Sequence, residues 1–116
     1  MEAVIDTSIL IDYLRKADKD CLFLQIIHQA KMYISLITVA ELYSGRSAQK
    51  SDKIKKMIKE MLEGMEIVIP TVDLAKKAGY LREKYQLSLP DAFIAALALD
   101  LNVPLATLDV RDFKQI

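Results

Sequence analysis

The sequence predicts an α/β protein: a three-layer α/β/α sandwich in which helices cover both faces of a central parallel sheet of four strands. Short apolar runs alternate with helical patterns along the whole chain, and this alternation is typical of parallel sheets. One helical stretch, residues 92–99, is apolar on every side, so it belongs in the interior. The length of 116 residues corresponds to one ordinary domain, and we expect residues 1–116 to form it.

The elements expected in the first half of the chain follow one another closely. They are strands at residues 3–5 and 32–35 and helices at 8–15, 21–31, 38–46 and 50–63. The strands are short apolar runs, and the helices carry apolar side chains at helical spacing. The last of these helices has the clearest pattern, because its apolar residues recur at positions i, i+3, i+4, i+7 and i+8. Gly64 then ends it.

The second half of the chain continues the alternation. Its expected elements are strands at residues 66–69 and 104–107, a helix from the Thr71 cap to Tyr85, a helix at 90–101 and a terminal turn at 110–113. Pro70 ends the third strand, because proline has no N–H to donate to a sheet. In parallel sheets of this kind, functional sites lie beyond the carboxyl ends of the strands.

Composition excludes several classes of protein. Hydrophobic residues make up 53% of the chain and charged residues 28%, which excludes disorder. The 16 basic and 16 acidic side chains cancel, which excludes a basic arm but not a basic patch on one face. Cys21 and His28 are the only residues of their types, which excludes a disulfide, a cysteine zinc site and paired catalytic histidines. No signal peptide or membrane span is visible, so we expect a cytoplasmic protein without membrane contact.

Four acidic residues lie where they could meet, three of them at the carboxyl ends of expected strands and the fourth at the start of the apolar helix. Asp6 directly follows the first strand, and Glu41 lies one turn into the helix after the second. Asp91 opens the apolar helix, and Asp109 follows the fourth strand. We therefore expect the four carboxylates to converge on one edge of the sheet.

Each acid also has a purely structural interpretation. Asp6 can cap the first helix, and Asp109 can be an ordinary turn residue. The spacings 38–41 and 88–91 are those of a capping box, which would account for Glu41 and Asp91. These interpretations predict no common placement relative to the sheet, whereas a functional cluster requires one.

A cluster of carboxylates has a predictable chemistry. Two unit charges about 4 Å apart repel by roughly 4 kcal/mol at an effective dielectric near 20, so protons or a divalent cation must bind. Oxygen ligands suit Mg²⁺ or Mn²⁺ and disfavour zinc, and such a cation, alone or paired with a second, activates water at a phosphate. Thr7, Ser8 and Thr107 could orient ligands or water, or could simply cap nearby backbone.

Four segments resemble the motifs of the PIN-domain ribonucleases. Val4-Ile5-Asp6-Thr7-Ser8 resembles the opening motif of that family, residues 35–42 resemble the second, residues 89–95 the third and residues 106–113 the fourth. The motifs occur in the family's order and span essentially the whole chain. As a lone compact domain, the chain is most similar to the VapC-type toxins of toxin–antitoxin pairs.

The resemblance implies a Mg²⁺- or Mn²⁺-dependent endoribonuclease that hydrolyses RNA phosphodiester bonds. Asp6, Glu41, Asp91 and Asp109 would be its catalytic and metal-binding residues. Asp112 is the alternative fourth acid, because the family places that acid either two or five residues after the threonine. The resemblance also implies an inhibitory antitoxin protein and a homodimer. Many relatives continue into a further edge strand, so the sheet has four strands or a truncated fifth.

A basic segment follows the helix that carries Glu41. It contains six cations and one acid, Asp52; the cations are Arg46, Lys50, Lys53, Lys55, Lys56 and Lys59. A phosphodiester substrate needs positive charge near an acidic pocket, and we take Arg46, Lys50, Lys53 and Lys56 as candidate RNA contacts. The alternative is a solvated helix face.

Other functions are open to a chain with these residues. A stand-alone RNA-processing nuclease of the same family would use the same acids, and a non-catalytic PIN module would bind RNA or protein without cleaving. The presence of all four acids argues against the second of these. A phospho-acceptor receiver domain needs paired acids after its first strand and a lysine after its last. Here Asp6 is followed by Thr7 and Ser8, and Asp109 stands in place of the lysine.

Overall fold

A four-stranded parallel sheet forms the centre of the computed structural model, which describes residues 1–16 and 21–116. The strands are β1 (Glu2–Ile5), β2 (Lys31–Ser35), β3 (Glu66–Val68) and β4 (Leu105–Ala106). They lie in the order β3-β2-β1-β4, so β1 is flanked on both sides. In the register, Val4 is opposite Tyr33 on β2 and Leu105 on β4. The predicted fold class, a sandwich around a four-stranded parallel sheet, is confirmed.

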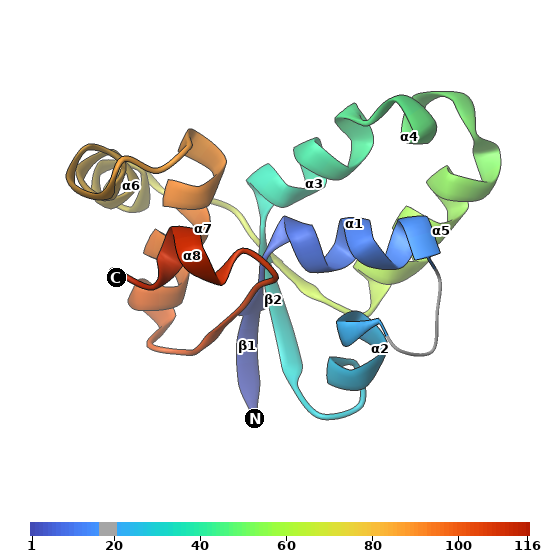
Figure 1. The fold of residues 1–116 in the computed structure, drawn as a ribbon, viewed down its shortest axis with the longest axis horizontal. Coiled ribbons are helices and arrows are strands. Elements are labelled where there is room, and N and C mark those ends of the chain that lie inside the picture. The colour runs from blue at the N-terminus through green and yellow to red at the C-terminus, as the bar shows by residue number, and fades with distance from the viewer. Residues whose placement is uncertain (17–20) are drawn as a thin grey trace.

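Helices cover both faces of this sheet. They are α1 (Thr7–Lys16), α2 (Leu22–Ile26), α3 (Leu36–Ser44), α4 (Arg46–Lys50), α5 (Asp52–Glu63), α6 (Val72–Tyr85), α7 (Leu89–Leu101) and α8 (Val110–Phe113). Figure 1 shows the sheet edge-on, with α6, α7 and α8 on one side and α1, α2 and α5 on the other. No described helix has the length and apolar character that a membrane crossing requires.

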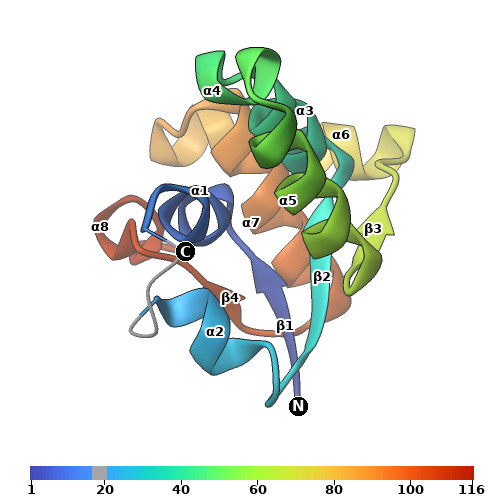
Figure 2. The same cartoon turned by 90° about the vertical axis from the view of Figure 1, so that its right-hand side faces the viewer.

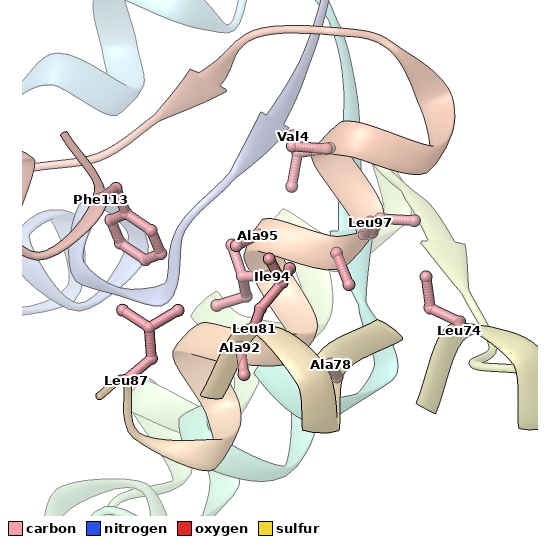
Figure 3. Close-up of a cluster of buried hydrophobic side chains, with 12 residues drawn as sticks. Val4, Leu74, Ala78, Leu81, Leu87, Ala92, Ile94, Ala95, Leu97 and Phe113 are labelled. Carbon is pink, nitrogen blue, oxygen red and sulfur yellow. The ribbon is translucent and has the colours of Figure 1, made fainter. Parts of the chain in front are cut away.

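Two buried clusters, one on each face, hold the layers together. Successive side chains of a strand point to opposite faces, so Val4 joins the cluster under α6 and α7 while Ala3 and Ile5 join the one under α1 and α5. Figure 3 shows the first cluster, in which Ala78, Ala92 and Ala95 lie between the larger side chains. As predicted, α7 is the internal helix, because its residues from Ala92 to Ala98 are buried apart from the half-buried Phe93.

The apolar stripe of the helix that ends before Gly64 packs into the second cluster. Ile58 and Met61 are buried there, and Ile54 packs against them. The helix itself is shorter than residues 50–63, because Ser51 is extended with φ −115° and ψ 116°. Its hydroxyl accepts from the Ile54 amide at 3.2 Å and caps α5, so residues 46–50 form the separate helix α4. Figure 2 shows α4 and α5 as two separate coils.

Four further elements differ in their bounds from those expected. The helix expected at 21–31 ends at Ile26, because the Lys31 amide donates to the Met1 carbonyl at 2.8 Å and begins β2. The helix expected at 38–46 begins at Leu36, because the Ser35 hydroxyl accepts from the Ile37 amide at 3.1 Å. The strands expected at 66–69 and 104–107 are trimmed to three and two residues.

Candidate active site

The four predicted acids line one cavity at the carboxyl ends of the strands. Asp6 lies between β1 and α1, Glu41 on α3, Asp91 in the first turn of α7 and Asp109 just before α8. The cavity has a volume of ≈ 380 Å³, and we call it the acidic cavity. In Figure 1, β1 and β2 rise from the N-terminal end, and α1 and α3 begin at their upper ends. The fold thus brings together acids that are up to 103 residues apart in the chain.

Asp6 is held by two hydroxyl groups. Its carboxylate is buried, and its Oδ2 atom accepts from Ser8 Oγ at 2.7 Å and from Thr107 Oγ1 at 2.6 Å. Backbone amides in turn donate to both hydroxyls: Leu108 N to Ser8 at 3.1 Å and Asp109 N to Thr107 at 2.9 Å. Each hydroxyl therefore accepts from a backbone amide and donates its single proton to the Asp6 carboxylate. This network fixes Asp6 relative to the segment that carries Asp109.

Glu41 is held by the first residue of α1. Thr7 Oγ1 donates to Glu41 Oε1 at 2.7 Å and lies 3.0 Å from the hydroxyl of Thr38. Thr38 is fully buried and is not the first residue of a capping box, because α3 already begins at Leu36. The capping interpretation of Glu41 is therefore wrong. Thr7, Ser8 and Thr107 all contact an acid of the cavity.

Asp91 lies in the capped first turn of α7, and its carboxyl has a raised pKa. Its backbone N–H donates to Ser88 Oγ at 3.2 Å, so Ser88 caps α7 as the 88–91 spacing predicts. Burial and then the charge of Asp6 raise the pKa of the Asp91 carboxyl to about 6; a hydrogen bond with Ser88 opposes this rise, and Asp112 and Glu41 add smaller contributions to it. A carboxyl with such a pKa titrates close to neutrality, as carboxyls at functional sites commonly do.

The two candidates for the fourth acid occupy different cavities. Asp109 lines the acidic cavity, and burial followed by the charge of Asp6 raises its pKa. Asp112 lines a separate cavity of ≈ 310 Å³ on the other side of Asp91, together with Arg111 and Gln115. Asp91 is the residue that the two cavities share. Asp109 therefore lies in the same cavity as Asp6, Glu41 and Asp91.

The donor set of the acidic cavity fits a hard divalent cation. Its polar lining is made of carboxylates and hydroxyls together with Arg15, and oxygen donors are what Mg²⁺ and Mn²⁺ bind. Among residues 1–16 and 21–116, no three potential ligands are grouped closely enough to form a ready-made metal shell. Mg²⁺ usually keeps several waters and uses one or two carboxylates, so the residues present fit this cation.

Sequence reasoning missed two residues of the cavity, Asp12 and Arg15. Both lie on α1, and Asp12 forms an ion pair with Lys16 at 3.0 Å. The signal was available: on a helix that begins with Thr7 and Ser8, Asp12 is four positions after Ser8 and Arg15 three after Asp12, so all of them share one face. Arg15 is the sole cation among the described residues that line the acidic cavity.

The basic segment divides into two parts in the structure. Arg46 and Lys50 line a groove of ≈ 820 Å³ between α1, α3, α4 and α5. We call this the basic groove. Lys53 and Lys56 are exposed on α5 and are not part of the groove's lining. His28 is exposed and Cys21 is buried as a free thiol, and neither lines the acidic cavity.

Comparison with known proteins identifies the family of this fold and site. The family model described as "PIN domain" matches residues 3–116, so the chain belongs to the PIN-domain family. It is also 31% identical to Ribonuclease VapC1 of Methanocaldococcus jannaschii, over 97% of this chain and 79% of that relative. The resemblance to PIN-domain ribonucleases of the VapC type, predicted from four motifs, is confirmed, and the chain is a nuclease of that type.

Solved structures of relatives agree with this family. A chain of a toxin–antitoxin complex from Klebsiella pneumoniae is 30% identical, with a TM-score of 0.82 over 99% of this chain and 92% of that one. VapBC2 from Rickettsia felis, bound to a DNA fragment from its promoter, has a TM-score of 0.82 over 100% of this chain and 93% of that one. At 22% identity, this second likeness supports the fold alone.

Proposed function

We propose that this chain is a Mg²⁺- or Mn²⁺-dependent endoribonuclease and the toxin of a toxin–antitoxin pair. The proposal rests above all on the acidic cavity, where Asp6, Glu41, Asp91 and Asp109 face one space at the carboxyl edge of the sheet. Oxygen ligands gathered in this way are suited to bind a divalent cation. Because RNA is the substrate, the activity belongs in the cytoplasm.

Each acid has a role that its surroundings support. Asp6 and Glu41 would hold the cation from positions fixed by the hydroxyls of Ser8, Thr107 and Thr7. Asp91 would complete the cation site from the start of α7. When bound, the cation would stabilise charge on the phosphate and lower the pKa of an attacking water.

Asp109 is the fourth acid of this proposal, with Asp112 as the alternative. Asp109 shares the cavity with the other three acids, whereas Asp112 lies beyond Asp91. The bond from the Asp109 amide to Thr107 couples its position to that of Asp6. Asp109 would therefore contribute to the same cation site as Asp6.

A test of the nuclease uses the purified chain and single-stranded RNA. Cleavage is expected with Mg²⁺ or Mn²⁺, is expected to stop in chelator and to return when the cation is restored. Asp6→Asn should lower the cleavage rate by more than about 100-fold, beyond what is typical for residues that only orient a ligand. Asp73→Asn is the matched control, because Asp73 is exposed on α6. Equal cleavage in chelator would exclude the metal mechanism.

The proposed antitoxin follows from the relatives, two of which come from toxin–antitoxin or VapBC complexes. A partner could silence the site by inserting an arginine among the carboxylates, because a guanidinium pairs with them bidentately. Expression of the chain alone should arrest growth of a host cell, and Asp6→Asn should not. Co-expression of a small protein from the adjacent gene should restore growth. A harmless wild type would instead indicate a stand-alone RNA-processing nuclease or a non-catalytic module.

A further inference from the structure

The basic groove is continuous with the acidic cavity. Ile11, Arg15 and Glu41 line both spaces, so the two meet along the inner face of α1 and the side of α3. The groove, at ≈ 820 Å³, is about twice the size of the acidic cavity, at ≈ 380 Å³. In Figure 1, α1 runs below α3 and α4, the helices that form the opposite wall. An extended molecule that has one unit in the acidic cavity can therefore continue into the groove.

The charges of the groove favour a polyanion. Arg15, Arg46 and Lys50 line it, and Glu41 is the single acid among its described lining residues. None of the ion pairs formed by the described residues uses any of these three cations. A guanidinium without an acidic partner is available to bind a phosphate bidentately.

At the opposite exit from the acidic cavity, acidic side chains outnumber basic ones. Beyond Asp91, the smaller cavity is lined by the two acids Asp91 and Asp112 and by one cation, Arg111. Like charges would repel a phosphate there, whereas three cations would attract it on the groove side. The two exits from the acidic cavity therefore carry charge of opposite sign. The positive charge of the basic groove favours a nucleic-acid strand on that side.

The floor of the groove is aliphatic. Ile11, Leu14, Leu42 and Ile54 contribute to it, while the cations belong to exposed residues. Apolar side chains of this kind can sandwich an unstacked base, and the exposed cations remain free to contact phosphates. The surface thus has places for both parts of a nucleotide.

We propose that the RNA strand next to the scissile phosphate runs from the acidic cavity into the basic groove, where Arg15, Arg46 and Lys50 bind its phosphates. The inference rests on the proposed ribonuclease function and adds to it a path for the substrate and a binding residue, Arg15. It also assigns Lys53 and Lys56, which the sequence suggested as contacts, a lesser part, because they lie outside the groove.

The experiment measures binding of a fluorescently labelled single-stranded RNA oligonucleotide to the full chain in chelator, at several salt concentrations. Arg15→Gln and Lys50→Gln should each weaken binding about tenfold and lower the slope of log affinity against log salt by about 0.7, as expected for one lost phosphate contact to a single strand. Arg15→Lys keeps the charge, so its slope should stay near the wild-type value. In steady-state cleavage with Mg²⁺, Arg15→Gln should raise KM more than it lowers kcat.

Matched controls are available on the other face of the sheet. Arg82→Gln and Lys76→Gln make the same chemical changes at exposed positions of α6, and their binding should match the wild type. If the groove variants behave like these controls while the wild type still cleaves RNA, the path is wrong and the nuclease proposal stands. If they bind RNA normally but lose a co-expressed partner protein, the groove is a protein-docking surface and the inference is likewise overturned. A wild type that neither binds nor cleaves RNA would overturn the proposed function itself.

Discussion

The two halves of the acidic cavity are built in different ways. On the strand side, Asp6 and Glu41 accept short hydrogen bonds from Ser8, Thr107 and Thr7. On the helix side, Asp91 and Asp109 have raised pKa values, caused first by burial and then by the charge of Asp6. Burial and neighbouring like charges both oppose the charged form of a carboxylate. The two halves therefore differ: hydroxyl groups hold Asp6 and Glu41 in position, whereas the raised pKa values of Asp91 and Asp109 favour the binding of a proton or a cation there.

The largest expected effects are losses of RNA cleavage when Asp91, Asp109 or Asp112 is replaced. Asp91→Asn should lower metal-dependent cleavage by more than about 100-fold, because it removes the acid common to both cavities rather than an orienting group. Asp109→Asn should lower cleavage clearly, and Asp112→Asn should lower it less, because only Asp109 lines the acidic cavity. Single-turnover rates with labelled RNA measure this order. A greater loss for Asp112→Asn would make Asp112 the fourth acid.

A smaller effect is expected when the strand side loses one hydroxyl. Thr107→Val keeps the shape of the side chain but removes both the 2.6 Å bond to Asp6 and the acceptor of the Asp109 amide. Groups that orient a metal ligand are typically worth about 10- to 100-fold in activity. Cation titrations should show weaker binding in the same variant.

The matched control for this variant is Thr71→Val, which removes the hydroxyl that caps α6. Loss of such a cap costs about 1 kcal/mol of stability, so its melting temperature should fall while its specific activity stays at the wild-type level. Equal activity of Thr107→Val and Thr71→Val would show that the hydroxyl network does not position Asp6 for the reaction.

The smallest effect is a change of stability with pH in the absence of divalent cations. The folded protein retains the Asp91 proton up to about pH 6, whereas the unfolded chain releases it near the ordinary value of 3.8. The folded state therefore binds more protons in this window, and stability falls as the pH rises through it. The melting temperature should drop by roughly a few degrees between pH 4.5 and pH 7.

The same pH series in Asp91→Asn isolates the contribution of this carboxyl. The variant should lack the drop in this window and should melt above the wild type at pH 7, because it has neither the burial cost of the Asp91 charge nor its repulsion from Asp6. Added Mg²⁺ should stabilise the wild type more than the variant. A wild type whose stability rises between pH 4.5 and pH 7 would contradict the raised pKa of Asp91.

Much of this arrangement can be predicted from the sequence, because it depends on neighbours along the chain. Three apolar residues at 3–5 are enough to indicate a buried strand, and the pattern of α5 is visible without any partner. Asp6, Glu41 and Asp109 follow from the rule that parallel strands share their carboxyl edge, and Asp91 stands out as the acid that opens the apolar helix. Ser51 is the counterexample, since its extended backbone divides a helix that periodicity alone would continue.

The sequence by itself determined the alternation of strands and helices, the internal position of α7 and the four acids, because apolar periodicity and the order of elements are properties of the chain. Only the tertiary structure decided that Thr107 bonds to Asp6 across 101 residues, that Asp112 lies in another cavity and that Arg15 lines two cavities at once. The reason is physical: a hydrogen bond requires two atoms about 3 Å apart with the correct direction, and such a distance between remote residues exists only after the layers have packed.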